Sequence, residues 1–180
     1  GIDPPARYLG ISGGGHGAMT GAMLKELEAC FLELGPDAVV VYGDTNSTLA
    51  GTLAASKLHI PVVHVEAGLR SFNRRMPEEQ NRIVADHLAD RLMTPTEIAT
   101  RNLEREGISG DRVVQVGDVM YDAAREFGAI AKQSSTILDR LGLTQNQYVL
   151  ATIHRAENTD DPDRLPIIVE ALDMVSQDIP

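Results

Sequence analysis

The sequence predicts an α/β fold with a parallel sheet, and three observations lead to that prediction. Short β-branched runs alternate along the chain with stretches of helical periodicity, as in stacked βα units. Every expected strand ends in a polar cluster. With 180 residues, of which 43% are hydrophobic, the chain is long enough to bury a core without disulfides or metals.

The expected strands are short, and most are followed by a helix. We predict strands at 37–43, 60–66, 91–95, 112–118 and 147–154. We predict helices at 48–58, 77–90 and 96–107, and a long helical segment at about 119–141. In the helix at 77–90, Pro77 suits the first position and the acids after it suit the first turn. Its expected apolar stripe is Ile83, Val84 and Leu88.

Charge and cysteine content exclude several classes of protein. The net charge of −10, from 16 basic and 26 acidic residues, argues against a nucleic-acid binder. No apolar run reaches the roughly 18 residues of a membrane helix, and there is no secretory leader pattern. The single cysteine, Cys30, excludes an internal disulfide, fits a reducing compartment and is expected to be a buried, inert thiol.

The polar residues at the strand ends are expected to form a site. They are Asp44, Glu66, Thr94, Asp118 and His154. In open parallel sheets the ligand crevice lies outside the carboxyl ends of the strands, so these side chains should converge on one edge. The five histidines show no metal-ligand spacing and there is one cysteine, so we expect no metal site.

The glycine-rich segment ISGGGHGAMTG at 11–21 is compatible with two interpretations. Gly13, Gly15 and Ala18 match the spacing of a dinucleotide-binding turn. The acid expected about 20 residues later is missing, because Asp44 is the first candidate at a strand end and lies further on. We therefore favour a flexible glycine loop before a helix.

Asp44 lies in the strand-to-helix turn YGDTNSTLAG at 42–51. One interpretation is helix capping by Asp44, Asn46 or Ser47, and the other is a chemical role for Asp44 at the edge of the crevice. The turn lacks the lysine that a P-loop requires.

Glu66 ends an almost wholly apolar strand, where partial desolvation should raise its pKa towards that of a working acid or base. Arg70 is the expected compensating cation, and a purely structural Glu66–Arg70 pair is the alternative. For Glu78 and Glu79 a favourable position at the start of a helix, after Pro77, is the stronger explanation. His154 precedes a polar loop, and a lone histidine is often structural.

Four segments together resemble the non-hydrolysing UDP-N-acetylglucosamine 2-epimerases. They are GDTNSTLAG, HVEAGLRSFNRRMPEEQNR, VGDVMYDA and IHRAEN, in that order, and the similarity extends over essentially the whole chain. The sequences SFNRRMPEE and GDVMYD are most similar to those of the branch of this family that includes archaeal enzymes and UDP-diacetamidoglucuronic acid 2-epimerases.

The resemblance implies a GT-B-like fold of two Rossmann-like domains and a cofactor-free reaction on a UDP-sugar. UDP would be eliminated as the C2 proton leaves, giving a glycal, and would re-add after reprotonation from the opposite face. By position in the motifs, the family's essential acids fall on Asp44, Glu66 and Glu78, and its essential histidine on His154. Arg70 and Arg82 are our own candidates for orienting these carboxylates and binding substrate.

The resemblance also implies a homodimeric, cytoplasmic enzyme of cell-surface polysaccharide biosynthesis. Residues 1–142 would be most of the first domain, and 143–180 the truncated start of the second, UDP-binding domain. Segments of the family that bind the nucleotide have no counterpart here, so we expect the isolated chain to have little activity. The alternatives are the diacetamidoglucuronic acid epimerase, a GT-B glycosyltransferase and a non-enzymatic remnant.

Overall fold

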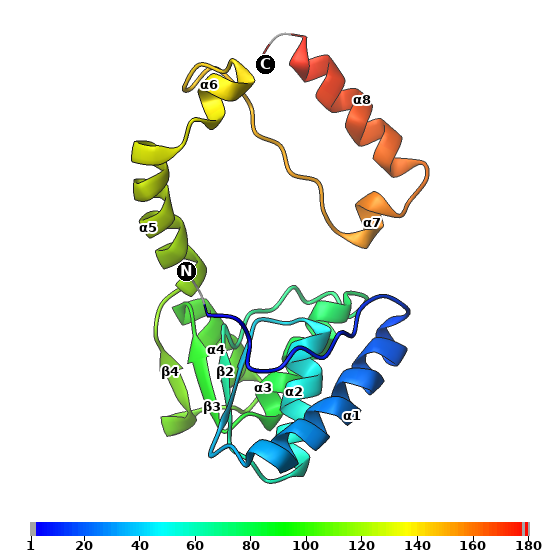
Figure 1. The fold of residues 1–180 in the computed structure, drawn as a ribbon, viewed down its shortest axis with the longest axis vertical. Coiled ribbons are helices and arrows are strands. Elements are labelled where there is room, and N and C mark those ends of the chain that lie inside the picture. The colour runs from blue at the N-terminus through cyan, green and yellow to red at the C-terminus, as the bar shows by residue number, and fades with distance from the viewer. Residues whose placement is uncertain (1–2, 178, 180) are drawn as a thin grey trace. The chain divides into compact units, whose positions relative to one another are not determined.

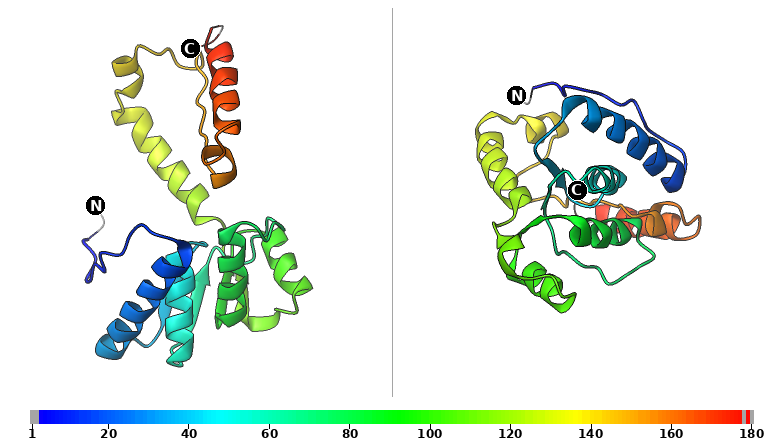
Figure 2. Two further views of the ribbon diagram at one scale, coloured as in Figure 1. Left: turned by 90° about the vertical axis from the view of Figure 1, so that its right-hand side faces the viewer. Right: turned by 90° about the horizontal axis from the view of Figure 1, so that it is seen from below.

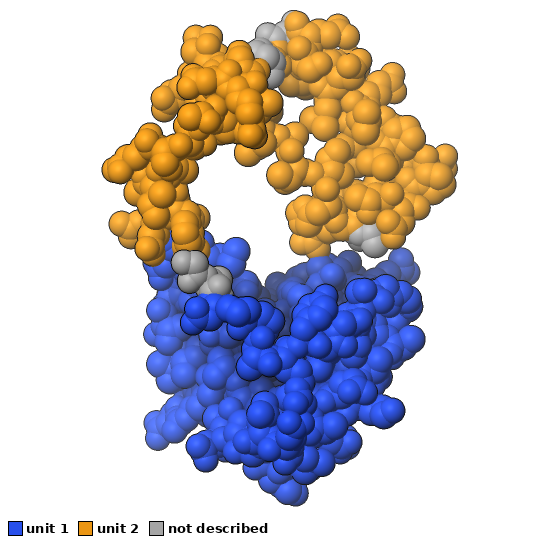
Figure 3. Space-filling view, in the orientation of Figure 1, with its two compact units in different colours: residues 1–122 blue, residues 123–180 orange. Residues whose placement is uncertain are grey.

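The computed structural model describes residues 3–177 and 179, with the side chains of 156 and 157 outside that description. The chain divides into two compact units, residues 1–122 and 123–180, which Figure 3 shows in different colours. The predicted domain boundary at residue 142 remains a prediction.

The first unit alternates strands and helices as expected (Figure 1). Its strands are β1 (Val39–Tyr42), β2 (Val62–Val65), β3 (Arg91–Thr94) and β4 (Val113–Gln115). Its helices are α1 (His16–Leu34), α2 (Asn46–Lys57), α3 (Pro77–Leu88) and α4 (Glu97–Arg105), followed by a short 3-10 turn, η1 (Gly110–Arg112), and the start of α5 (Val119–Ser134). The predicted strands and helices of this unit are thereby confirmed, with ends shifted by a few residues.

All four strands are parallel and lie in the order β1-β2-β3-β4. The register pairs Tyr42 with Val65, and Val65 with Met93. Because the strands are short, parallel and paired along their length, their carboxyl ends lie along one edge of the sheet, as predicted.

The core lies between one face of the sheet and the helices, which stand on one side of the strands (Figure 2, left). Val62 and Leu92 point into this layer and are fully buried, and Leu103 of α4 packs against them. Side chains of alternate residues point to the opposite face. There Val40 and Tyr42 remain more than half exposed.

Local sequence explains where these helices begin. Thr45 caps α2 by accepting a hydrogen bond from the Thr48 backbone amide, and Thr96 caps α4 in the same way through Ala99. Capping of α2 by Asp44, Asn46 or Ser47 was therefore wrong. Pro77 occupies the start of α3 as predicted.

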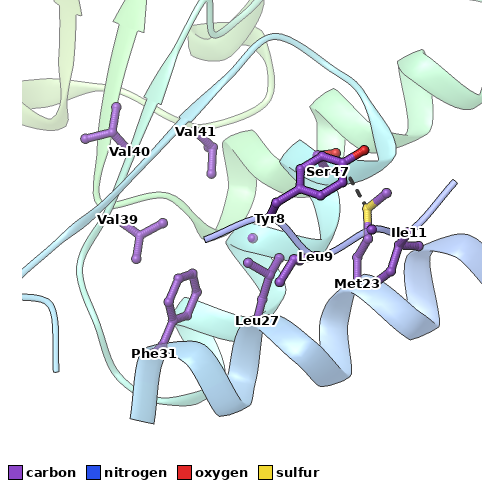
Figure 4. A pocket seen from close by; sticks show the side chains of 12 residues that line it. Tyr8, Leu9, Ile11, Met23, Leu27, Phe31, Val39, Val40, Val41 and Ser47 are labelled. Atoms are coloured by element: carbon purple, nitrogen blue, oxygen red, sulfur yellow. Dashed lines mark hydrogen bonds between the residues drawn. The ribbon is translucent and has the colours of Figure 1, made fainter. Parts of the chain in front are cut away.

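An apolar cavity of about 380 Å³ lies between the N-terminal segment, α1 and β1 (Figure 4). Leu27 and Phe31 of α1 face Val39 across it, and Tyr8 and Leu9 line another side. None of its lining residues is charged, and it contains none of the predicted site residues. Cys30 is buried nearby on α1, as expected.

The second unit consists of helices and connecting segments in the described residues. These are the remainder of α5, then α6 (Ile137–Leu141), α7 (Ala156–Thr159) and α8 (Arg164–Ser176). The predicted strand at 147–154 is wrong, because this segment forms no ladder with another strand in the described chain. The helical segment at 119–141 is interrupted at 135–136. No described helix has the length and apolarity needed to span a membrane.

Candidate active site

Backbone hydrogen bonds continue the sheet for one residue beyond its strands and align the loops at its carboxyl edge. The Gly43 amide donates to Val65 O at 3.1 Å, and the Glu66 amide donates to Met93 O at 3.1 Å. On the other side, the Val116 amide donates to the Thr94 carbonyl. The turns that contain Asp44, Glu66 and Asp118 therefore follow β1, β2 and β4 at the same edge of the sheet.

Asp44 is held by a cation from α3. Arg82 Nη2 donates to Asp44 Oδ2 at 2.6 Å, and Arg82 Nη1 donates to Glu79 Oε2 at 3.0 Å. Because Thr45 caps α2, the Asp44 carboxylate is available for this ion pair and remains partly exposed. The geometry agrees with the expectation that Arg82 orients a carboxylate of the site.

Glu66 occupies a left-handed backbone conformation, with φ of 72°. Such a conformation is uncommon for a non-glycine residue and is often found at functional sites. It turns the carboxyl group towards Gly43, where a Cβ atom would lie 3.5 Å from Glu66 Oε2. Such a contact would be ordinary, so position 43 favours glycine because of its positive φ of 63°.

The pKa of Glu66 is raised, first by burial and then by the negative charges of Asp44 and Asp118. The positive charges of Arg82 and His64 act in the opposite direction. A carboxyl group with a raised pKa can hold or release a proton closer to neutral pH, as an acid or base must. The prediction of a raised pKa for Glu66 is confirmed.

Glu79 has a structural role in this unit. Its carboxylate accepts hydrogen bonds from the Ser71 amide and hydroxyl and from the Phe72 amide, all within 3.0 Å. Burial alone would raise its pKa, but these hydrogen bonds and Arg82 hold the pKa of Glu79 below its usual value. Its neighbour Glu78 is exposed on the first turn of α3.

The expectation that Arg70 compensates Glu66 needs correction. The buried Arg70 guanidinium donates instead to Asp86 Oδ2 at 2.7 Å and to both carboxylate oxygens of Glu106 at 2.7 Å. Burial opposes its charge, but these two acids keep the pKa of Arg70 above its usual range. The main cation acting on Glu66 is Arg82.

The face of α3 that points inward was also predicted wrongly. Val84 and Leu88 of the expected apolar stripe are exposed, whereas Glu79 and Asp86 are buried. Positions 79, 82 and 86 recur at helical spacing, so this polar stripe could have been found in the sequence. It was missed because buried charges need partners on other elements, which one segment cannot reveal.

Asn81 and Asn46 extend the polar edge and were not predicted as site residues. Asn81 Nδ2 donates to the Asp44 carbonyl at 2.9 Å and to Asn46 Oδ1 at 3.3 Å. Asn46 Nδ2 in turn lies 3.1 Å from His16 Nδ1. The glycine-rich segment is thus followed by a helix, α1, whose first residue contacts this edge. Both asparagines lie in the quoted motifs, which was the available signal.

The other three predicted strand-end residues, Asp118, Thr94 and His154, have different surroundings. Asp118 Oδ1 accepts from the Met120 amide at 2.8 Å and so begins α5. Thr94 is buried and hydrogen-bonded to Thr100. His154 is exposed in the second unit, and its relation to the carboxylates stays a prediction. The described residues contain no cluster of three His, Cys, Asp or Glu that could hold a metal ion.

A parallel α/β sheet with Asp44 and Glu66 following adjacent strands is the arrangement of a Rossmann-like protein, a class in which ligands generally bind at the carboxyl edge of the sheet. The family model described as UDP-N-acetylglucosamine 2-epimerase matches residues 1–180. The chain therefore belongs to the UDP-N-acetylglucosamine 2-epimerase family, and the resemblance noted in the sequence is confirmed.

One curated relative and two solved structures illustrate the similarity. The UDP-2,3-diacetamido-2,3-dideoxy-D-glucuronate 2-epimerase of Pseudomonas aeruginosa is 54% identical over 97% of this chain and 49% of its own length. The UDP-GlcNAc 2-epimerase of Methanocaldococcus jannaschii, solved in complex with UDP-GlcNAc and UDP, matches with a TM-score of 0.90 and 46% identity, covering 98% of this chain and 49% of that one. The Rickettsia bellii UDP-N-acetylglucosamine 2-epimerase matches with a TM-score of 0.88 and 34% identity, covering 99% and 46%.

The chain spans about half the length of the curated relatives it matches. The expected fold class, a Rossmann-like sheet belonging to a GT-B-like fold, is confirmed by the parallel sheet and by these structural matches.

Proposed function

We propose that the full-length protein containing this chain is a UDP-N-acetylglucosamine 2-epimerase that interconverts UDP-GlcNAc and UDP-ManNAc. The observation that most supports this is the placement of Asp44 and Glu66 on adjacent strand ends, with the pKa of Glu66 raised. Family membership gives the reaction class. The proposal extends it to a substrate and to named residues.

The chemistry requires proton transfer at C2 and departure of UDP from C1. In the elimination, a base takes the C2 proton, the electron pair forms the C1–C2 double bond, and UDP leaves with the C1–O bonding electrons. In the return step, UDP re-adds at C1 and C2 receives a proton on the opposite face. Glu66, whose pKa is raised, is suited to one of these transfers, and Asp44 is the neighbouring carboxylate. Glu78 and His154 complete the proposed catalytic set.

The positively charged residues have two different proposed roles. Arg82 pairs with Asp44 and would hold that carboxylate in position, or contact substrate from the partly buried edge. Arg70 is fully engaged with Asp86 and Glu106, so its contribution would be indirect. No cofactor is required in this scheme, because the electron pair that leaves with UDP returns in the second half-reaction.

A diacetamidoglucuronic acid nucleotide is the second candidate substrate. The observation that favours it is the 54% identity with the Pseudomonas aeruginosa enzyme, against 48% with the Methanocaldococcus jannaschii UDP-N-acetylglucosamine 2-epimerase. Both candidates need the same inversion at C2. A cytoplasmic homodimer supplying precursors of cell-surface polysaccharide completes the proposal.

Proton NMR of each UDP-sugar incubated with the full-length protein in deuterated water tests the proposal. Deuterium at C2 together with an epimerised product supports the elimination route for that substrate. Transfer of the sugar to an acceptor without C2 exchange would contradict it and support a glycosyltransferase. The same assay on residues 1–180 tests the expectation that this chain alone has little activity.

A further inference from the structure

A buried charged network lies directly beneath the candidate site. His64 of β2 and Asp86 of α3 are fully buried, and His64 Nδ1 lies 2.7 Å from Asp86 Oδ1. Asp86 Oδ2 accepts from Arg70 and, at 3.1 Å, from the Gly68 amide. Glu106 completes the network by binding Arg70 on the outer side.

The contacts of His64 define its protonation state. Its second ring nitrogen, Nε2, lies 2.7 Å from the Gly43 carbonyl oxygen, which can only accept a hydrogen bond. Its first, Nδ1, faces Asp86, and the two donors on the other oxygen of Asp86 favour the ionised carboxylate. Each ring nitrogen therefore faces an acceptor, which is the arrangement in which both can donate.

This network connects the two backbone segments that contain the candidate acid and base. Gly43 directly precedes Asp44, and Gly68 follows Glu66 by two residues. His64 binds the first segment through the Gly43 carbonyl, and Asp86 binds the second through the Gly68 amide.

Gly68 itself cannot move towards α4. A Cβ atom at this position would lie 2.4 Å from the Ala99 carbonyl oxygen, so its backbone is in direct contact with that helix. Asn102 Nδ2 also donates to the Gly68 carbonyl at 3.0 Å. The network therefore connects the Gly43 turn to a loop that is already fixed.

We propose that His64 is a positioning residue held as an imidazolium, which fixes the Asp44 and Glu66 segments relative to one another and favours the ionised form of Glu66. The kinetic part of this inference rests on the proposed epimerase function. His64 contacts Asp86 from α3, with Arg70 behind that carboxylate, and its charge acts on Glu66 at the end of β2.

The charged groups that act on Glu66 determine what removal of this charge would do. Asp44 and Asp118 oppose its ionisation, whereas Arg82 and His64 favour it. Loss of the imidazolium charge would remove one of the two favourable cations, so we expect the pKa of Glu66 to rise further.

The first experiment uses the unmodified full-length protein with ¹⁵N-labelled histidine and needs no substrate. A long-range proton–nitrogen spectrum at about pH 8 should show two similarly shifted, protonated ring nitrogens for His64. His87, which is exposed on α3, is the reference for a solvent-accessible ring. Two widely separated nitrogen shifts, typical of a neutral tautomer, would overturn the proposal.

The second experiment compares His64→Gln with the matched control His87→Gln in the full-length enzyme. Glutamine can donate one hydrogen bond to the Gly43 carbonyl but has no charge. We expect kcat to fall about 10- to 100-fold through lost positioning, with KM nearly unchanged. The limb of the pH–rate profile that reports Glu66 should move to higher pH, and His87→Gln should leave both unchanged.

The outcomes separate this inference from the proposed function. An unchanged pH profile in an active His64→Gln enzyme, even with reduced kcat, would overturn the role for the charge. If His64→Gln does not fold, the spectrum of the unmodified protein still decides the protonation state. If the unmodified protein shows an imidazolium but no C2 exchange on either UDP-sugar, the proposed function fails while the buried imidazolium stands.

Discussion

The two compact units differ in how their charged and apolar side chains are satisfied. In the first unit, apolar side chains form a core and buried charges such as Asp86 have partners from several elements. In the second, none of the described side chains is buried, and apolar residues such as Leu150 are largely exposed. Helices formed in both units because their hydrogen bonds are local, whereas a sheet formed only where strands could pair.

The candidate site residues also differ between the two units in how well their contacts are defined. Asp44 and Glu66 lie in the unit whose contacts determine their geometry. His154 lies in the unit where the described structure provides few such contacts. The carboxylates are thus candidates on geometric grounds, and His154 is a candidate on the resemblance.

The largest expected effect is a loss of kcat, and it shows whether residues of both units contribute to catalysis. Glu66→Gln and His154→Gln in the full-length enzyme should each lower kcat about 10²- to 10⁴-fold, because each removes a proposed proton-transfer group. Deuterium exchange at C2 measures the loss. Glu97→Gln, which removes an exposed carboxylate paired with Arg101, is the control and should retain activity. Full activity of His154→Gln would restrict the chemistry to the first unit.

Stability should respond very differently to the loss of a leucine in each unit. Leu103→Ala should lower the free energy of unfolding by about 2–5 kcal/mol, because the side chain is fully buried in the core. Leu150→Ala, at a side chain 82% exposed, should change it by less than about 0.5 kcal/mol. Urea unfolding followed by circular dichroism measures both. Equal losses would show that the second unit is packed in solution.

Two left-handed glycines provide a matched test of close packing. Gly68→Ala should cost about 2–4 kcal/mol, because the added Cβ meets the Ala99 carbonyl in addition to the conformational cost. Gly142→Ala, in the C-cap of α6, has open space and should cost about 1–2 kcal/mol from conformation alone. Thermal unfolding of the two variants provides the comparison, and a smaller loss for Gly68→Ala would contradict the close approach to α4.

The smallest effects concern two carboxyl groups whose pKa is lowered. The folded pKa of Glu79 lies below its ordinary value of 4.5, so its ionised form stabilises the fold at neutral pH. That contribution is lost as the pH falls from 4.5 through the folded pKa. Unfolding free energies measured across this window should fall less steeply for Glu79→Gln than for the unmodified chain.

Asp161 is the carboxyl group of the second unit whose pKa is lowered, as that of Glu79 is in the first unit. Its pKa is lowered because it accepts hydrogen bonds from the Asp163 and Arg164 amides at the start of α8. It lies in the second unit and its hydrogen-bond partners are in that unit too, so Asp161→Asn should leave the acid dependence of the first unit unchanged. A common response of both variants would show that the two units unfold as one.

Much of the fold could be predicted because its causes are local. Short apolar runs indicated β1 to β4, and Pro77 with its acidic neighbours indicated the start of α3. The strand at 147–154 could not be predicted correctly, because a β-strand requires a neighbour that the described chain does not supply. The sequence also indicated that strand-end polar residues would meet at one edge.

What the sequence determined by itself was the α/β class, the order of its elements and the family, because these depend on periodicity and on motifs of adjacent residues. Only the tertiary structure decided which charges pair: Arg82 with Asp44, and Arg70 with Asp86 and Glu106. The partners come from elements 16 to 38 positions apart in the chain. A buried charge is stabilised by whatever partner the fold brings within hydrogen-bonding distance, and no local pattern specifies that partner.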